Sequence, residues 1–312
     1  MKKIVVVMGG PSTEAEVSRR SGTAILNALK SKGYNAEGME LVPENFPQQI
    51  KESGADFVFN ALHGKFGEDG IIQGVLEMLN IPTTTAGVLP AAVTMDKVAT
   101  KRYFMAENIP TPKARTYFRY EYKKRDLVSE IKAEFGVPVV VKASSQGSSI
   151  GVVIVEKAED LDAALTEAFK YDREILVEQF IKGRELTVAV LCGDDGMHEA
   201  LPIIEITTVT GRYDYDTKYK PGASTHIIPA PLAPEVTAEI KDIAVRACSV
   251  CGCNGVARVD FMLDEDNHPY AIEINTVPGM TETSLVPDAG RAAGMEFPEL
   301  CERILTMAGF QK

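Results

Sequence analysis

Apolar runs and amphipathic stretches alternate along the first third of the chain. The run Ile4–Met8 predicts a buried strand, and Ser18–Lys30 has apolar residues at helical spacing. Gly33 is placed to end this helix, because glycine readily takes the left-handed conformation of a helix terminus. Two further strands and a helix are expected at Asn35–Leu41, Asp56–Asn60 and Ile71–Leu79. The alternation predicts an α/β unit with a parallel sheet, whose ligand sites lie beyond the carboxyl ends of the strands.

The middle third predicts a smaller α+β unit. Leu89–Asp96 is expected to be a connection, and Asp96 is a residue type that caps a helix, which here extends to Asn108. The prolines in Ile109–Pro112 end that helix. The remaining elements are expected as a strand at Ala114–Phe118, a charged helix at Glu121–Phe135, strands at Pro138–Lys142 and Gly151–Val155, a helix at Ala158–Phe169 and a strand at Glu174–Glu178.

The last third predicts another α+β unit. Its expected elements are strands at Glu185–Leu191 and Glu199–Ile204, a helix at Pro234–Cys251, a hairpin of Val256–Leu263 with Pro269–Asn275, and two short closing helices. A long polar segment rich in tyrosine, Gly211–His226, is typical of a lid over a site. We therefore expect an N-terminal α/β domain at 1–95, a central domain at 96–180, and a C-terminal domain at 181–312 with a lid loop at 211–226.

Composition agrees with several compact units and argues against some classes of partner. The 312 residues, 45% of them hydrophobic, are too many for one typical domain, and the net charge of −11 disfavours a nucleic-acid partner. The apolar run after the first two lysines is too short for a signal peptide, and no stretch approaches the length of a membrane span. We expect a cytoplasmic protein with neither a nucleic-acid nor a membrane partner.

Three of the five cysteines, Cys248, Cys251 and Cys253, lie close together in the sequence. A zinc site would need a fourth ligand at a matching spacing, and the four histidines lie elsewhere. Reduced cysteines at a helix end are therefore the favoured interpretation.

The strongest local signal for chemistry is the pair of segments Arg258–Asp260 and Glu273–Asn275. Side chains alternate along a strand, so Arg258 shares a face with Asp260, and Glu273 shares a face with Asn275. A hairpin that turns near Asp266 places Asp260 opposite Glu273, to within one residue. Opposed carboxylates destabilise a sheet unless a cation lies between them, and two carboxylates with an amide oxygen suit Mg²⁺. The alternative is a solvent-exposed hairpin with scattered charges.

A loop of small residues follows the strand that ends at Lys142. The loop Ala143–Gly151 can fold its amide groups over phosphates while Lys142 supplies charge, or it can be an ordinary hairpin turn. It is not a Walker A loop. Gly147–Gly151 also matches the Gly-x-Ser-x-Gly motif of serine hydrolases, with Ser149 as nucleophile and His226 as base. That motif requires a helix next, whereas the β-branched residues that follow predict a strand.

Two loops that follow strands of the first third offer further polar groups. Ala61–Gly70 has His63 at the end of a strand, where α/β proteins place functional groups, although alone the pattern favours a structural histidine. Gly9–Ser18 lacks the glycine spacing of a dinucleotide-binding loop. Its Glu14 lies near the head of a helix, where it either complements the helix dipole or binds a ligand ammonium.

Taken in chain order, these motifs resemble the D-alanine–D-alanine ligases of bacterial cell-wall synthesis, within the ATP-grasp superfamily. The matching segments are GGPSTEAEVS, ALHGKFGEDG, TMDK, VVVKASSQGSS, LVEQFIKGRE, YDYDTKY, GVARVDFM and IEINTVPGMTETSLVP. They span nearly the whole chain in family order. The resemblance implies an ATP-grasp fold of mixed α/β and α+β class, in which two α+β units hold ATP between them beside the N-terminal α/β domain.

The resemblance also implies roles for particular residues. ATP would be bound by Lys97, Lys142, Glu178, Phe180, Ile181, Glu185, Tyr213 and Lys218. Two Mg²⁺ or Mn²⁺ ions would be held by Asp260, Glu273 and Asn275. The two D-alanine molecules would be bound by Glu14, Val17, His63, Ser284 and Leu285. Ser148 and Tyr219 would join Glu14 in closing the site, and Arg258 with the Gly279 amide would stabilise the oxyanion. A homodimer is implied as well.

The implied reaction joins two D-alanine molecules for peptidoglycan precursor synthesis. Transfer of the γ-phosphoryl group of ATP makes a D-alanyl phosphate, which the second amine attacks. Tyr219 would accompany D-alanine as acceptor, since relatives that make the D-lactate ester carry phenylalanine there. Ala143 and Gln146 depart from the commonest family wording at positions without an implied role. The alternatives are another ATP-grasp ligase with a different acceptor and a non-catalytic ATP-binding module.

Overall fold

The structure is a computed structural model that describes residues 2–147, 150–208 and 224–311. Its strands are β1 Lys3–Met8, β2 Asn35–Glu40, β3 Phe57–Asn60, β4 Ala114–Phe118, β5 Val139–Ala143, β6 Val152–Val155, β7 Glu174–Gln179, β8 Gly183–Cys192, β9 His198–Ala200, β10 Ile204–Thr208, β11 Ser224–Ile227, β12 Gly255–Asp264 and β13 Pro269–Asn275. Its helices are α1 Ala15–Ser31, α2 Phe46–Glu52, α3 Ile71–Met78, α4 Val88–Met95, α5 Lys97–Ala106, α6 Arg119–Tyr122, α7 Leu127–Phe135, α8 Leu161–Tyr171, α10 Pro234–Val250, α11 Leu285–Ala292 and α12 Phe297–Met307, with a 3₁₀ turn at Ala158–Asp160.

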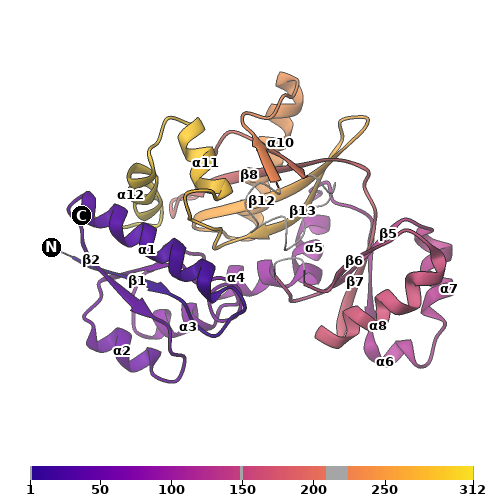
Figure 1. The fold of residues 1–312 in the computed structure, drawn as a ribbon, viewed down its shortest axis with the longest axis horizontal. Coiled ribbons are helices and arrows are strands. Elements are labelled where there is room, and N and C mark those ends of the chain that lie inside the picture. Colours follow the sequence, from indigo (N-terminus) through magenta and orange to yellow (C-terminus); the bar gives the residue numbers. More distant parts are fainter. Residues whose placement is uncertain (1, 148–149, 209–223, 312) are drawn as a thin grey trace.

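A parallel sheet in the order β2-β1-β3 lies at one end of the molecule (Figure 1). Strand β1 is buried on both faces: Ile4 and Val6 pack against α1 and α12, while Val5 and Val7 pack against α2 and α3. Helix α1 ends as expected, because Gly33 has a φ of +79° and donates its amide to the Lys30 carbonyl oxygen. The predicted α/β unit with a parallel sheet is confirmed.

Four antiparallel strands in the order β4-β7-β5-β6 form a second sheet at the opposite end (Figure 1). One face of this sheet packs on α7 and α8 through a core that includes Val139, Val141 and Val177. The alternation of side chains along each strand sends Lys142 and Glu178 to the other face. Two groups predicted to bind ATP therefore share the face of this sheet that is opposite to α7 and α8.

The largest sheet is antiparallel, in the order β11-β10-β8-β12-β13 with β9 on β8, and lies between the other two (Figure 1). On one face, Val259, Phe261 and Leu263 are fully buried beneath α10. Arg258 and Asp260 project from the other face, as the period-two pattern predicted. At the far end of this second face, apolar residues of β8 share one continuous core with α1, α11 and α12. That shared core fixes the parallel sheet against the largest sheet.

Three predicted elements are wrong. Leu89–Asp96 is mostly helix, since α4 spans Val88–Met95 and Pro90 lies in its first turn, where no amide donor is needed. The helix expected at Glu121–Phe135 is divided into α6 and α7, because Asp126 caps α7 by accepting from the Ser129 amide. The strand expected at Glu199–Ile204 is two strands, β9 and β10, with Pro202 between them. Helix α2 was not predicted.

None of the described helices is long and apolar enough to cross a membrane.

Gly255, at the start of β12, is in contact with the N-terminal part of the chain. Its φ is +73°, and a Cβ there would lie 1.7 Å from the carbonyl oxygen of Thr84. Replacement by alanine is expected to destabilise the fold by more than the about 1–2 kcal/mol of a left-handed residue alone, because the backbone must also move. Gly33→Ala is the matched control, since Gly33 has a similar φ but no described atom within 4 Å of the added Cβ. Urea unfolding of both variants measures the difference, and equal losses would contradict this account.

Candidate active site

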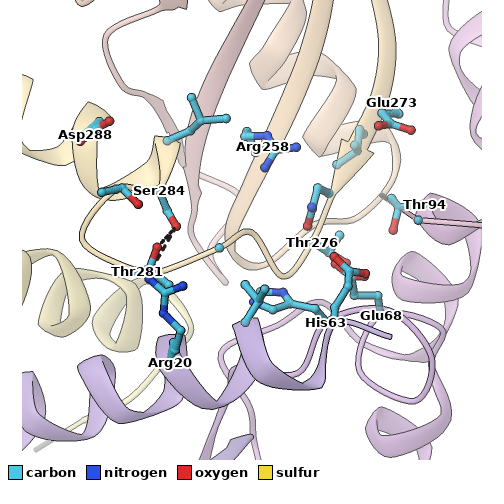
Figure 2. A pocket seen from close by; sticks show the side chains of 18 of the residues that line it. Arg20, His63, Glu68, Thr94, Arg258, Glu273, Thr276, Thr281, Ser284 and Asp288 are labelled. Atoms are coloured by element: carbon cyan, nitrogen blue, oxygen red, sulfur yellow. Dashed lines mark hydrogen bonds between the residues drawn. The ribbon is translucent and has the colours of Figure 1, made fainter. Parts of the chain in front are cut away.

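A cavity of about 590 Å³ lies between the loops of the parallel sheet and the polar face of the largest sheet. Figure 2 shows Arg20, His63 and Glu68 on one side of it and Arg258, Ser284 and Asp288 on the other. Ten of the predicted site residues line this cavity: Glu14, Val17, His63, Lys97, Arg258, Glu273, Asn275, Gly279, Ser284 and Leu285. Residues from distant parts of the sequence are thus brought together at one place.

A register shift in the β12–β13 hairpin creates the opposed carboxylates. Beyond the turn, Phe261 pairs with Ala271, but Asp260 pairs with Glu273, because a bulge lies between Asp260 and Phe261. Unshifted pairing would continue from Phe261–Ala271 to place Ile272 opposite Asp260. The bulge therefore puts both acids on the face that Arg258 and Asn275 share, and the predicted opposition of Asp260 and Glu273 is confirmed.

Cations already balance both acids. The guanidinium of Arg258 binds Asp260 in a bidentate manner, with Nε–Oδ1 at 2.8 Å and Nη2–Oδ2 at 2.7 Å. The Thr187 hydroxyl on β8 also donates to Asp260 Oδ1, at 2.6 Å. The Nζ of Lys97 lies 3.3 Å from Glu273 Oε2 and donates to the Gln146 carbonyl oxygen at 2.7 Å. Lys97 thus ties the small-residue loop to the carboxylate strand.

The other described residues that were predicted to contact ATP do not line this cavity. Lys142 is ion-paired with Glu178 on the neighbouring strand, and both are buried. Ile181 is buried and Phe180 half-buried in the segment between β7 and β8. Glu185 begins the polar face of β8, two residues before Thr187. These residues lie on β5, β7 and β8 and on the segment that connects β7 of the four-stranded sheet to β8 of the largest sheet.

His63 connects the parallel sheet to the C-terminal segment of the cavity wall. Its Nδ1 lies 2.9 Å from the Val277 carbonyl oxygen, so Nδ1 carries the proton and donates it. Burial lowers the pKa of His63, which favours the neutral ring. Nε2 then accepts from the Ser21 hydroxyl at 3.4 Å, and Ser21 Oγ accepts from the Met280 amide at 3.2 Å. The predicted substrate-side histidine therefore also has a structural role.

Glu68 lines the cavity but was given no role from the sequence. It accepts from the Gly64 amide at 2.6 Å. Burial, together with the nearby charge of Glu14, raises the pKa of Glu68 to about 8. The signal was present in the segment ALHGKFGEDG, where Glu68 follows a glycine turn, but sequence alone does not show that this carboxyl is buried beside another.

The far end of the cavity is the beginning of α11. Ser284 stands at the N-cap position, yet its hydroxyl is turned away from the helix and accepts from the Thr281 amide at 3.0 Å. The first-turn amides of Leu285 and Val286 are therefore not capped by it, which suits an anionic ligand. Asp288, four residues after Ser284, is bound to His226 at 2.6 Å and to Arg291. Arg20, Asp288 and Arg291 were not predicted to line this site, and His226 was predicted only as the last residue of the lid and as the base of the hydrolase alternative.

Some predicted site residues lie outside the described residues, namely Ser148, Tyr213, Lys218, Tyr219 and most of the predicted lid loop 211–226. Ser149, the nucleophile of the hydrolase alternative, lies outside them too. The motif's context is nevertheless described: the next element is β6, which pairs antiparallel with β5 instead of forming a helix. The hydrolase interpretation therefore lacks its structural setting.

All five cysteines are buried free thiols. Among the described residues, no group of three or more His, Cys, Asp or Glu side chains could hold a metal ion. The cluster Cys248, Cys251 and Cys253 belongs to the core beneath the largest sheet.

Comparisons with known proteins agree with this architecture. A family model described as D-ala D-ala ligase C-terminus matches residues 104–306, and one described as D-ala D-ala ligase N-terminus matches residues 36–86. The D-alanine–D-alanine ligase of Desulforamulus reducens is 48% identical over 310 residues, covering 98% of both chains. That of Pelotomaculum thermopropionicum is 48% identical over 309 residues, covering 98% of this chain and 96% of the relative.

The chain belongs to the D-alanine–D-alanine ligase family.

Solved structures of this family have the same fold. The D-alanine–D-alanine ligase of Bacillus anthracis complexed with ATP matches with a TM-score of 0.83 and 32% identity, covering 99% of this chain and 97% of that one. The VanG D-Ala:D-Ser ligase of Enterococcus faecalis matches with a TM-score of 0.84 and 28% identity, covering 98% and 99%. The predicted ATP-grasp fold, with a parallel N-terminal sheet and antiparallel sheets beyond it, is confirmed.

The raised pKa of Glu68 predicts a pH dependence of stability. The pKa of about 8 means that the folded state holds this proton up to about pH 8, whereas the unfolded chain releases it near the ordinary glutamate pKa of 4.5. The stability associated with the protonated carboxyl is therefore present at low pH and lost as pH rises between these two values. Glutamine cannot ionise, so Glu68→Gln does not lose this stability. Between about pH 5 and about pH 9 its free energy of unfolding should therefore rise relative to that of wild type, by roughly 1.4 kcal/mol for each pH unit that separates the folded and unfolded pKa values of Glu68. Urea unfolding at both pH values measures this, and a constant difference would refute it.

Proposed function

We propose that this chain joins two D-alanine molecules to D-alanyl-D-alanine at the expense of ATP, through a D-alanyl phosphate, for peptidoglycan precursor synthesis. The observation that carries the proposal is the single cavity lined by Glu14, His63, Lys97, Arg258 and Glu273. It combines a carboxylate for an ammonium, cations for phosphates and an arginine for an oxyanion. Relatives at 48% identity over almost the full chain are named for this reaction.

The phosphates of ATP are assigned to Lys97 and Lys142. These lysines belong to α5 and to the four-stranded sheet, and Lys97 is bonded to the small-residue loop that follows Lys142. Glu178, Phe180, Ile181 and Glu185 lie along the segment between the two antiparallel sheets and are assigned to the nucleoside. Tyr213 and Lys218 are assigned to the same ligand from outside the described residues.

Two Mg²⁺ or Mn²⁺ ions are assigned to Asp260, Glu273 and Asn275. The donor set fits, because hard oxygens from two carboxylates and an amide share one face of β12 and β13. Asp260 and Glu273 are now balanced by Arg258 and Lys97, so the face is built to hold positive charge against them. Bound there, the ions would neutralise the charge of the transferring phosphoryl group.

The two amino acids are assigned to opposite ends of the cavity. Glu14 and Val17 on the N-terminal side, with His63, would hold the first D-alanine by its ammonium and backbone. The amides at the start of α11, with Ser284 and Leu285, would receive the carboxylate of the second. Arg258 and the Gly279 amide lie between them on the cavity wall, where they would donate to the tetrahedral oxyanion. Ser148 and Tyr219 are assigned to a hydrogen-bonded link with Glu14.

The domain limits 1–95, 96–180 and 181–312 are retained as part of the proposal. Each sheet has apolar residues of its own, which supports three units. Helix α5 is shared, however, because Phe104 is fully buried in the core of the largest sheet. A cytoplasmic location is proposed because the reaction consumes ATP and the five thiols are free.

A homodimer is proposed as well. Exposed apolar side chains gather on α3 and α4, with Ile71 48% exposed, Met78 89% and Leu89 65%. The two helices are in contact, so these residues form a patch of the kind that protein interfaces cover. Light scattering should give about twice the chain mass of 33.9 kDa, and Met78→Glu with Leu89→Glu should give the monomer.

Phosphate release from ATP with different acceptors tests the reaction. D-Alanine alone should support turnover with formation of the dipeptide, whereas L-alanine should not. D-Lactate and D-serine, each offered with D-alanine, should yield little mixed product by mass spectrometry. A predominant mixed product would assign another acceptor and leave the ATP-dependent ligase intact. Absence of ATP turnover with every acceptor would contradict the proposal as a whole.

Glu273→Gln tests the metal assignment. It should lower kcat by at least about 10²-fold at saturating Mg²⁺, the scale of losing one preorganised electrostatic group. The fold should persist, since glutamine is nearly isosteric and Glu273 is only partly buried. Calorimetry with Mn²⁺ and ADP should show weakened ion binding independently of turnover. Normal ion binding and turnover in this variant would remove Glu273 from the metal site.

A further inference from the structure

Lys101 is a buried cation in α5 with no role in the family-derived assignments. It is only 4% exposed. Its Nζ lies 2.5 Å from Glu178 Oε1 and 2.5 Å from Thr111 Oγ1, and it donates to the Pro112 carbonyl oxygen at 3.2 Å. The contact with Glu178 Oε1 is an ion pair, and the contacts with Thr111 and Pro112 are hydrogen bonds. Lys101 is therefore held by protein groups, and it does not line the cavity.

In the described part of the chain, the ammonium group of Lys142 has fewer protein partners than that of Lys101. Among the described residues its ion-pair partner is Glu178, through Oε2. Within residues 2–147, 150–208 and 224–311 no second ion-pair partner of Lys142 is seen, and we assign its other protons to phosphate oxygens. Glu178 thus lies between two lysines, of which Lys101 is held by protein groups and Lys142 is assigned to ATP.

The charges of this buried cluster determine what Lys142 can offer. Two ammonium groups face one carboxylate, so the cluster retains one net positive charge. Burial alone would raise the pKa of Glu178, but the attraction of Lys142 and Lys101 outweighs it and the pKa is lowered. Glu178 is therefore ionised, and if it faced Lys142 alone it would neutralise the charge that ATP needs.

We propose that Lys101 is a positioning residue that serves as the counterion of Glu178, and so leaves the charge of Lys142 for the phosphates of ATP. This inference rests on the proposed function of Lys142. Lys101 acts through Glu178 and touches no substrate itself. Without it, the pair Glu178–Lys142 would be neutral, and ATP would lose one of its attracting charges.

The same ammonium fixes the cluster relative to the carboxylate strand. Thr111 Oγ1 donates to the Ala271 carbonyl oxygen at 2.7 Å, and the Ala271 amide donates to the Pro110 carbonyl oxygen at 2.8 Å. Ala271 lies on β13, two residues before Glu273. Figure 1 shows α5 at the junction between the four-stranded sheet and the largest sheet. Lys101 therefore links the phosphate lysine on one sheet to the carboxylate strand on the other.

A double-mutant cycle of Lys101 and Glu178 tests the proposal. Lys101→Met should weaken binding of a non-hydrolysable ATP analogue with Mg²⁺, measured by calorimetry, by roughly tenfold, or about 1.4 kcal/mol. The KM for ATP should rise in parallel, while the KM for D-alanine should not, because Lys101 does not line the cavity. Glu178 is itself assigned to the nucleoside, so the double variant is compared with Glu178→Gln alone. Adding Lys101→Met to Glu178→Gln should change analogue binding by less than about threefold, since no carboxylate remains for Lys101 to balance.

Two further variants control for charge and packing. Lys113→Met removes a positive charge from an exposed lysine, paired at the surface with Glu134, and should leave binding unchanged. Lys101→Arg keeps the charge and should bind the analogue more tightly than Lys101→Met. If Lys101→Met does not fold, the comparison of the double variant with Glu178→Gln alone still tests the role of Lys101.

The outcomes separate this inference from the function on which it rests. Wild-type affinity in folded Lys101→Met would overturn the counterion role. A loss of about tenfold on adding Lys101→Met to Glu178→Gln would overturn it as well, because Lys101 would then matter without the carboxylate. Failure of the wild-type protein to bind the analogue would instead contradict the proposed function.

Discussion

The site depends on holding like charges together on one face of the largest sheet. Asp260 and Glu273 are cross-strand neighbours, an arrangement that is unfavourable unless positive charge lies beside it. Arg258 is supplied two residues earlier on the same strand, and Lys97 arrives from the start of α5. Removing either cation from this partly buried face would weaken the compensation of an acid. The segments that provide these cations are consequently fixed relative to β12 and β13.

The remaining walls of the cavity are held by apolar packing and by a small polar network. The continuous core of α1, α11 and α12 sets the parallel sheet against the largest sheet. His63, Ser21 and the backbone at Val277 and Met280 then connect the two at the cavity itself. Because interiors are close-packed, this junction leaves little freedom in the separation of Glu14 from Arg258. Two amino acids and a phosphate can be aligned there only if that separation is maintained.

The junction with the four-stranded sheet is different in character. Here the link is polar: a buried carboxylate between two lysines, with the linker 110–112 bonded to β13. Polar links of this kind are directional and specify one arrangement, whereas apolar contacts tolerate sliding. The proposed nucleotide end of the site is thus oriented by charge and hydrogen bonding, and the proposed amino-acid end by packing.

The sequence by itself determined the elements with a clear period and the chemistry of short motifs. The alternation in VARVDFML placed Arg258 and Asp260 on one face, and the apolar runs of β1 and β3 predicted a buried parallel sheet. It failed at α4, where Pro90 is tolerated in the first turn of a helix, and at β9–β10, where Pro202 separates two strands that were expected as one. The local pattern of apolar and polar residues shows the period of a strand, but it does not show whether a proline begins or ends an element.

Only the tertiary structure decided the groups whose properties depend on distant neighbours. The bulge that sets Asp260 against Glu273 moves the register by one residue, which a hairpin sequence leaves open. The buried positions of Glu68 beside Glu14, and of Lys101 between Glu178 and Thr111, arise from segments far apart in the chain. Charge, burial and hydrogen-bond partners of such groups are set by what folds against them, and a linear pattern does not contain that information.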